Sequence, residues 1–192
     1  LRALAPLAII LIVLGGLTTG FFKVEANEQA VIRVFGKVSR TVGPGLHFKF
    51  PFGIARHDNV AVTERKKLEF GFRTTVPATR STFERAGYEG ESLMLTGDLN
   101  VADVEWVTQY NINDPVRYLF RVANVTETFR VMNEAVMREI VGDRTIDEAL
   151  TVGRSEIETV CELKLQELCD QYELDIAIDE VLLRNVNPPE EV

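Results

Sequence analysis

Residues 92 to 112 read SLMLTGDLNVADVEWVTQYNI, and this stretch decides the fold that the sequence predicts. From Ala102 to Ile112, every second residue is uncharged and mostly apolar, while Asp103 and Glu105 stand between them. Alternation with a period of two is typical of a strand that buries one face. Gly97 lies within a turn signal that precedes this strand. We therefore expect a β-hairpin whose long second strand buries Trp106.

Helices are predicted directly downstream of this strand. Asp114 and Pro115 have the residue types favoured at the N-cap and the first helical position. A second helix is expected from about Thr126 to Gly142, because one apolar stripe recurs at helical spacing. Its members are Val125, Phe129, Met132, Val136 and Ile140.

A third helix and a last strand complete the pattern. Thr145 and Glu148 form a capping-box sequence ahead of the third helix. Cys161 and Cys169 lie eight residues apart in that helix, which is too far for a disulfide within it, so we interpret both as small buried residues. A strand follows from residue 175, with an irregularity near Glu180. Strands first, then helices and a final strand, predict an α+β fold.

The segment VGPGLHFKFPF, residues 42 to 52, alternates in the same way. We expect this segment to run antiparallel to residues 27–38. Its end is then expected near the end of the uncharged N-terminal segment. Leu46 and Phe48 are expected in a protein core. The far tip is expected to contact lipid, since aromatic rings and lysine suit a membrane interface. The membrane-contacting residues predicted here are Phe21, Phe22, Lys49, Phe50, Phe52 and Ile54.

Ala3 to Phe22 is a stretch of 20 residues without a charge. As a helix it would be about 30 Å long, which matches the hydrocarbon core of a bilayer. A single transmembrane anchor over residues 1–23 is therefore predicted. A cleaved signal peptide and a buried core helix are the alternatives, and the sequence VEA at residues 24–26 weakly resembles a cleavage site.

Composition and motifs argue against several classes of function. The chain has 21 basic and 29 acidic residues and a net charge of −8, so no nucleic-acid partner is expected. No hydrolase, phosphate-loop or metal-protease motif occurs, and His47 and His57 lack any recognisable catalytic context. We predict no catalytic residue, no cofactor and no metal. The interpretation is a membrane scaffold and not an enzyme.

Four segments carry a resemblance to a known family: ANEQAVIRVFGKVSRTVGPGLHFKFPF, LMLTGDLNVADVEWVTQYNINDPVRYLF, EAVMREIVGDRTIDEALTVGR and NPPEEV. Together they resemble the SPFH superfamily of stomatin, prohibitin, flotillin, HflK and HflC. Within it they are most similar to the HflK-like group. The resemblance implies an SPFH domain of two subdomains, a membrane-proximal one over residues 24–91 and a second over residues 92–192. A C-terminal coiled-coil helix usually follows and is expected to lie beyond this fragment.

The resemblance also implies a function. HflK-like proteins assemble into rings or cages that enclose a patch of membrane, pair with an HflC-like paralogue and modulate the membrane AAA+ protease FtsH. They are single-pass proteins of the inner membrane with a periplasmic SPFH domain. The expected partners are thus membrane lipid, further copies of the chain, an HflC-like paralogue and an FtsH-type protease. The alternative is a lipid-microdomain scaffold of the stomatin or flotillin type without a dedicated protease.

Overall fold

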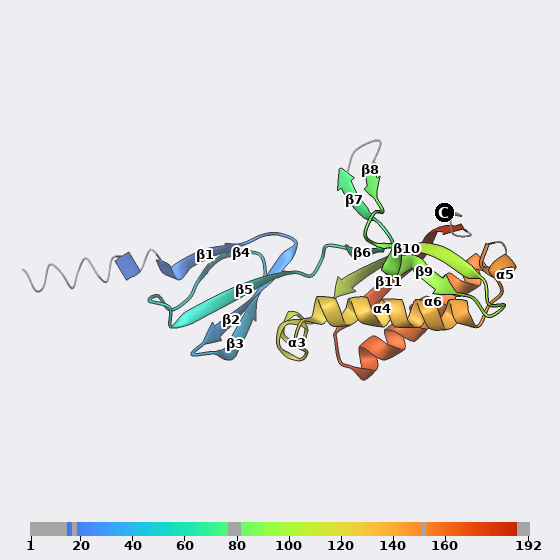
Figure 1. Ribbon diagram of the computed structural model, residues 1–192. Coiled ribbons are helices and arrows are strands. Elements are labelled where there is room, and N and C mark those ends of the chain that lie inside the picture. Colours follow the sequence, from blue (N-terminus) through green and yellow to red (C-terminus); the bar gives the residue numbers. More distant parts are fainter. Residues whose placement is uncertain (1–14, 17–18, 77–81, 151–152, 188–192) are drawn as a thin grey trace, which may run out of the picture.

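The computed structural model describes residues 15–16, 19–76, 82–150 and 153–187. Figure 1 shows two bodies arranged along one axis, with strands β1 to β5 in the first and β6 to β11 with the long helices in the second. Apart from the helical residues before β1 and the short helix Glu89–Ser92, strands precede helices along the chain, and one long strand follows them. The predicted α+β order is confirmed for the described residues.

The first body contains two small antiparallel sheets. In one, β1 (Phe21–Val24) pairs with β4 (Gly45–Phe48). In the other, β2 (Glu28–Val34) lies between β3 (Lys37–Val42) and β5 (Ala55–Ala61). A compact core lies between the sheets and consists of Phe22, Val24, Ala30, Ile32 and Ala55.

This pairing corrects the hairpin predicted from the sequence. We expected the Leu46 strand to pair with residues 27–38, but β2 pairs with β3 and β5 instead. Phe35 and Gly36 both adopt positive φ between β2 and β3, and this tight turn brings β3 back at once. β4 is therefore left to pair with the preceding strand, β1.

The second body is built around β10 (Val101–Ile112). Its neighbours are β11 (Ile176–Asn187), β6 (Lys66–Phe70) and β9 (Leu93–Leu95), all of them antiparallel to it. The hairpin predicted at residues 92–112 is confirmed. The predicted irregularity near Glu180 is also confirmed, because the register of β10 and β11 shifts between Gln109 and Tyr110, opposite that residue.

The helices of the second body lie along one face of this sheet (Figure 1). The long ones are α4 (Val125–Gly142) and α6 (Arg154–Gln171), and α3 (Pro115–Phe120) and α5 (Ile146–Leu150) are short. The predicted cap at Asp114 is confirmed. The predicted capping box also forms, but it caps the short α5, and α6, the predicted third helix, begins separately at Arg154. Asp114 accepts hydrogen bonds from the N–H groups of Val116 and Arg117, and Thr145 and Glu148 bond each other's backbone N–H groups.

The polar segment from residue 82 to residue 91 contains regular structure. β7 (Arg73–Val76) and β8 (Thr82–Glu84) pair as a hairpin that projects from the second body (Figure 1), and α2 (Glu89–Ser92) follows. The strand β6 pairs with β10, and its Leu68 and Phe70 belong to the larger core. The two bodies described here therefore meet after β5, and the subdomain boundary at residue 91 stays a prediction.

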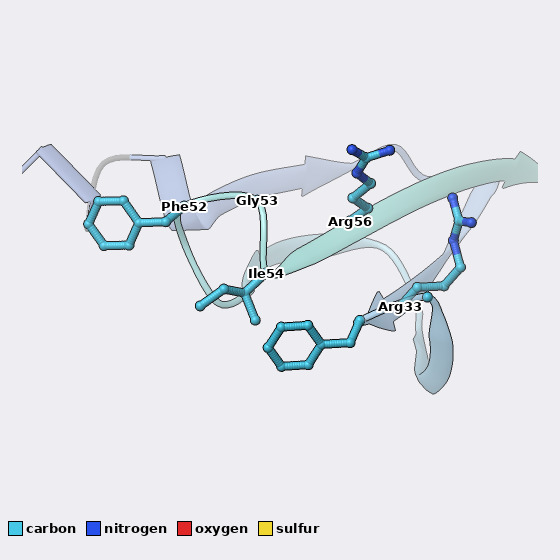
Figure 2. A pocket seen from close by; sticks show the side chains of 7 residues that line it. Arg33, Phe52, Gly53, Ile54 and Arg56 are labelled. Carbon is cyan, nitrogen blue, oxygen red and sulfur yellow. The ribbon is translucent and has the colours of Figure 1, made fainter.

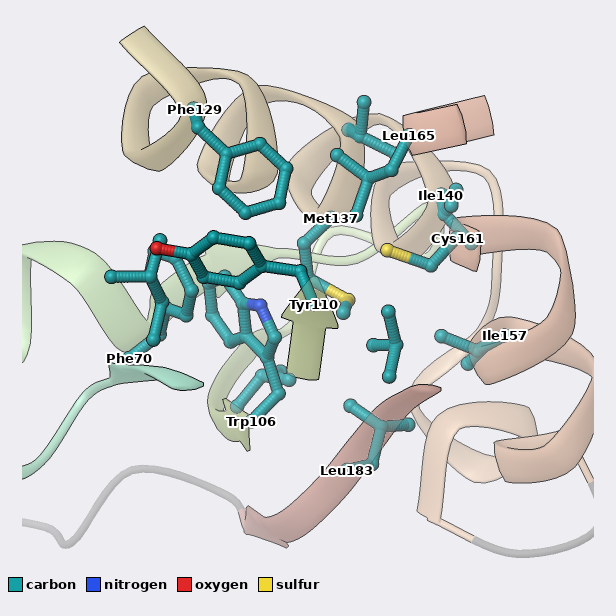
Figure 3. Close-up of a cluster of buried hydrophobic side chains, with 14 of the residues drawn as sticks. Phe70, Trp106, Tyr110, Phe129, Met137, Ile140, Ile157, Cys161, Leu165 and Leu183 are labelled. Atoms are coloured by element: carbon teal, nitrogen blue, oxygen red, sulfur yellow. The ribbon is translucent and has the colours of Figure 1, made fainter. Parts of the chain in front are cut away.

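The larger core lies between β10 and the long helices (Figure 3). Trp106 is fully buried as predicted, and its ring stacks on Phe70 at a centroid distance of 4.4 Å. Cys161 and Cys169 are buried and unbridged, as predicted. Figure 3 shows Cys161 among the side chains that α4 and α6 direct toward the sheet.

Most of the predicted anchor, residues 1–14 and 17–18, lies outside the described residues. Gly15, Gly16, Thr19 and Gly20 are helical and lead into β1. Within the described part of the chain, no helix has the length and apolar character that crossing a membrane requires.

Candidate membrane-contacting surface

Exposed apolar side chains gather on the first body. Among the described residues, eight large apolar side chains between positions 21 and 54 are exposed: Phe21, Phe35, Val38, Leu46, Phe48, Phe50, Phe52 and Ile54. Phe50 and Phe52 expose 61% and 63% of their area. Soluble monomeric proteins rarely expose large apolar patches, and such patches mark interaction sites. We call this set the apolar surface.

The end of β4 holds part of this surface beside the start of the described chain. The N–H of Lys49 donates to the carbonyl oxygen of Gly20 over 2.8 Å. The rings of Phe21 and Phe48 meet edge to face at 5.3 Å. A Cβ atom placed on Gly16 would come within 2.2 Å of the Phe52 ring, so this ring packs directly against the helical residues that precede β1. The apolar surface is thus continuous with the end of the N-terminal segment.

The expectation that Leu46 and Phe48 pack in a core is wrong. Leu46 is 71% exposed and Phe48 is 39% exposed. The register explains this, because cross-strand neighbours share a face and Phe48 lies opposite Phe21 while His47 lies opposite Phe22. Phe22 points into the small core, so His47 shares the inner face and the alternate residues of β4 point outward.

Phe22 and Lys49 differ from the other four predicted contact residues. The structure places Phe22 in the small core, where its ring stacks on His57 at 4.2 Å. Lys49 is half-buried, and its Nζ donates to Nδ1 of His57 over 2.9 Å. Phe21, Phe50, Phe52 and Ile54 are exposed. Of the six predicted contact residues, these four present their apolar side chains at the surface.

Burial and the neighbouring ammonium group of Lys49 lower the pKa of His57, and the nearby Asp58 carboxylate opposes them in part. The lowered pKa keeps the imidazole neutral around neutral pH, with Nδ1 free to accept the hydrogen bond from Lys49. This contact ties the Lys49 side chain to β5, directly beneath the apolar surface.

Charge is distributed unevenly between the two bodies. Residues 21–62 contain six basic and three acidic side chains, whereas residues 63–192 contain 14 basic and 26 acidic ones. The apolar surface therefore belongs to the basic part of an acidic chain. The other basic run, Arg65 to Lys67, is engaged elsewhere, since Arg65 pairs with Asp179 and Lys67 with Glu69.

Catalytic and metal-binding chemistry find little support in the described residues. In this part of the chain, no three His, Cys, Asp or Glu side chains are grouped so that they could hold a metal ion. Burial raises the pKa of both Cys161 and Cys169 to about 12, which keeps the thiols protonated and unreactive. The apolar surface is the candidate site that remains.

Sequence reasoning missed two members of this surface, Phe35 and Val38. Phe35 is 82% exposed in the turn after β2, and Val38 follows in β3. The available signal was Gly36, because a glycine directly after a strand marks a turn, and turns lie at the surface.

The fold and the comparisons with known proteins define the class together. A model of the SPFH domain / Band 7 family matches residues 22–192, and the chain belongs to that family. Among curated relatives, it is 38% identical to Protein HflK of Treponema pallidum over 94% of this chain and 55% of the relative. It is 33% identical to Protein HflK of Borreliella burgdorferi over 88% of this chain and 53% of the relative.

A third relative carries a functional description. The chain is 30% identical to the Modulator of FtsH protease HflK of Escherichia coli K12, over 91% of this chain and 36% of that protein. The resemblance to HflK-like proteins seen in the sequence is confirmed. The chain spans about half or less of the length of these relatives.

Proposed function

We propose that this protein is a membrane-anchored scaffold of the HflK type that modulates an FtsH-type membrane protease. The family match and the HflK relatives support the scaffold class, and the printed name of the Escherichia coli relative supports the protease partner. The protein regulates and assembles, with no catalytic step of its own.

One observation of the structure carries the membrane part of this proposal. Exposed Phe50 and Phe52 lie on the basic body, beside the residues that continue the uncharged N-terminal segment. An apolar end that also carries positive charge suits a lipid surface, because the rings enter the interface while the basic groups stay among the headgroups. The first body then rests on the bilayer, and the acidic second body points away from it.

The finer parts of the proposal follow the HflK-like relatives. The part of the predicted anchor that precedes β1 forms a single transmembrane segment in the inner membrane, and the SPFH domain lies on the periplasmic side. Copies of the chain assemble with an HflC-like paralogue into a ring or cage around a patch of membrane. The polar, acid-rich outer side of α6 suits contact with solvent rather than lipid.

A reconstitution experiment tests the protease role. The protein and the FtsH-type protease of the same organism are incorporated into one vesicle preparation, and degradation of a membrane substrate is followed with and without the protein. We expect the protein to change the degradation rate and to co-purify with the protease in mild detergent. Unchanged degradation together with no co-purification would instead favour the stomatin-type scaffold without a protease.

Resistance of the protein to alkaline extraction from membranes tests the anchor separately. An uncut anchor predicts that the chain stays in the membrane fraction and that mass spectrometry finds the apolar N-terminal segment. A mature chain that begins near Asn27 would identify that segment as a cleaved signal peptide.

A further inference from the structure

A pocket of about 420 Å³ opens between two turns of the first body (Figure 2). The turn after β2 and the turn before β5 form its walls, and two arginines of the adjoining strands complete it. The lining residues are Arg33, Phe35, Gly36, Phe52, Gly53, Ile54 and Arg56. Figure 2 shows Phe52 and Ile54 at one end and the two guanidinium groups set back from them.

The two arginines are an unfavourable pair for the fold alone. Arg33 of β2 lies directly opposite Arg56 of β5 in the antiparallel ladder, so both side chains are on the same face. Like charges directly opposite each other destabilise a sheet. An anion held near both groups would remove this repulsion.

Among the described residues, only one of these two arginines has an acidic partner. Arg33 pairs with Asp58 at 2.7 Å and lies over the Phe120 ring at 5.1 Å. Arg56 is exposed, and no acidic partner or hydrogen bond engages its side chain among the described residues. The positive charge of Arg56 is therefore available at the pocket.

The backbone of the two turns holds apolar side chains at the pocket entrance. Phe35 and Phe52 have φ values of +50° and +60°, a left-handed region that bulky residues rarely adopt. The N–H of Phe35 donates to the carbonyl oxygen of Ile54 over 3.1 Å and fixes one turn against the other. Strained residues of this kind cluster at ligand sites, where the surrounding structure maintains them.

We propose that this pocket binds the phosphate of an anionic phospholipid. Arg56 is the principal phosphate ligand, since a guanidinium group matches phosphate oxygens in geometry, and Arg33, which is paired with Asp58, lies beside it on the same face. Phe35, Phe52 and Ile54 contact the glycerol and acyl region of the same lipid. A headgroup that also carries an ammonium, such as that of phosphatidylcholine, is disfavoured by the two guanidinium groups.

The net charge of the chain makes this selectivity informative. At −8, the protein as a whole is repelled by an anionic surface, so a preference for anionic lipid has to arise from local groups. The inference rests on the proposed membrane contact of the first body and adds to it the lipid class and the residues that select it.

Tryptophan fluorescence in vesicles separates the two claims. The full chain carrying Phe50→Trp is reconstituted in vesicles with brominated phosphatidylglycerol or brominated phosphatidylcholine as the quencher, in an otherwise equimolar mixture of the two lipids. Phe50 is exposed but does not line the pocket, and the native Trp106 is fully buried in the second body. Quenching by either lipid reports contact with the bilayer, and the ratio of the two reports headgroup selection.

We expect stronger quenching by brominated phosphatidylglycerol than by brominated phosphatidylcholine. Arg56→Gln should lower this preference on the order of tenfold, because it removes one charge-assisted hydrogen bond. Arg56→Lys should retain part of it. The matched control is Lys23→Gln, which removes one positive charge from the same body at a residue that pairs with Glu25 and does not line the pocket. This control should keep the preference, and so should an excess of inorganic phosphate in the buffer.

The contrary outcomes are distinct. Equal quenching by both lipids, or an equal loss in Arg56→Gln and Lys23→Gln, would overturn the headgroup pocket and leave the membrane contact standing. Loss of the preference in inorganic phosphate would show a site for the free anion and overturn the assignment to lipid. Absence of quenching by either lipid would overturn the membrane contact itself, and the pocket's assignment with it.

Discussion

At the scale of single residues, Trp106 has the largest predicted effect on folding. It is fully buried at the centre of β10 and stacked on Phe70. Trp106→Ala should lower the free energy of unfolding by about 3–5 kcal/mol, because the substitution removes a large buried ring and leaves a cavity. Urea unfolding of the full chain in detergent, followed by circular dichroism, measures this.

The control for this prediction is Leu163→Ala on α6, where the native side chain is 67% exposed. That change should alter the free energy of unfolding by no more than about 0.5 kcal/mol, as is usual for surface sites. Comparable effects of the two substitutions would show that Trp106 does not pack as the structure has it.

His57 gives a pH dependence to the first body. Its pKa is lowered by burial and by Lys49, so over the range just below its ordinary value of 6.5 the unfolded chain holds a proton that the folded chain does not. Stability from this group is therefore complete above pH 6.5 and falls as the pH drops toward the pKa of the folded state. Titration of His57 by NMR should give a pKa below 6.5.

Lys49→Met tests the cause of that shift. Removal of the ammonium group should raise the pKa of His57 toward its ordinary value, while burial continues to hold it lower. A pKa that does not change in this variant would contradict the contact between Lys49 Nζ and His57 Nδ1.

Prediction from sequence worked well for single residues of β10 and less well for their polar neighbours. The alternation identified the buried face, including Trp106, because successive side chains of a strand point to opposite faces and one face of β10 packs against the helices. The same pattern assigned Glu105 to the outer face, yet it is buried and paired with Arg85 from a distant part of the chain. Such a partner comes from tertiary structure, which alternation does not encode.

At the scale of elements, one buried hydrogen bond joins the sheet to α4. The Thr108 hydroxyl donates to Oδ1 of Asn133 over 2.6 Å, and Nδ2 of Asn133 donates to the Phe129 carbonyl oxygen over 2.8 Å. Both side chains are completely buried. The apolar stripe predicted for this helix omitted Asn133, because a polar residue in a stripe is informative only when its partner is known.

Asn133→Ala should destabilise the second body by about 1–3 kcal/mol, since it leaves the buried Thr108 hydroxyl without its acceptor. The double variant Asn133→Leu with Thr108→Val replaces both partners by apolar groups and should recover much of this loss. Chemical unfolding of the native chain, Asn133→Leu, Thr108→Val and the double variant measures the coupling. Purely additive effects of the two substitutions would contradict a direct bond between the helix and the sheet.

The strand β4 shows where element-level prediction stops. Alternation over residues 46–52 predicted one strand with an aromatic face, but β4 ends at Phe48, and Phe50 and Phe52 lie in the segment that turns toward β5. Alternation also does not say whether such a face meets a core or the outside. The partner strand decides this, and the turn at Phe35 and Gly36 gives β4 the partner β1 instead of β2. Leu46 and Phe48 were therefore assigned to a core that they do not reach.

At the scale of the whole molecule, the two bodies differ in character. The second has a large core of buried side chains and most of the negative charge, while the first has a small core, a basic balance and the apolar surface. β5 connects them, with Ala55 in the small core and Val60 in the larger one. This division fits the proposal that the first body rests on a lipid surface and the second body points away from it.

Family membership could be predicted from the sequence because each motif that indicates it is a contiguous segment. The pocket could not be predicted in this way. Arg33 and Arg56 are far apart in the chain and meet only through the β2–β5 register. Their shared face depends on a pairing that the sequence analysis assigned differently.

The most direct test of the account is the environment of position 52 in the bilayer. A spin label attached to Phe52→Cys in the reconstituted full chain should be accessible to oxygen and shielded from a water-soluble nickel complex. The same label at Leu163→Cys on α6 should show the reverse, and the native thiols, both buried, should remain unlabelled. Equal accessibility to the nickel complex at the two positions would contradict contact between the apolar surface and the membrane.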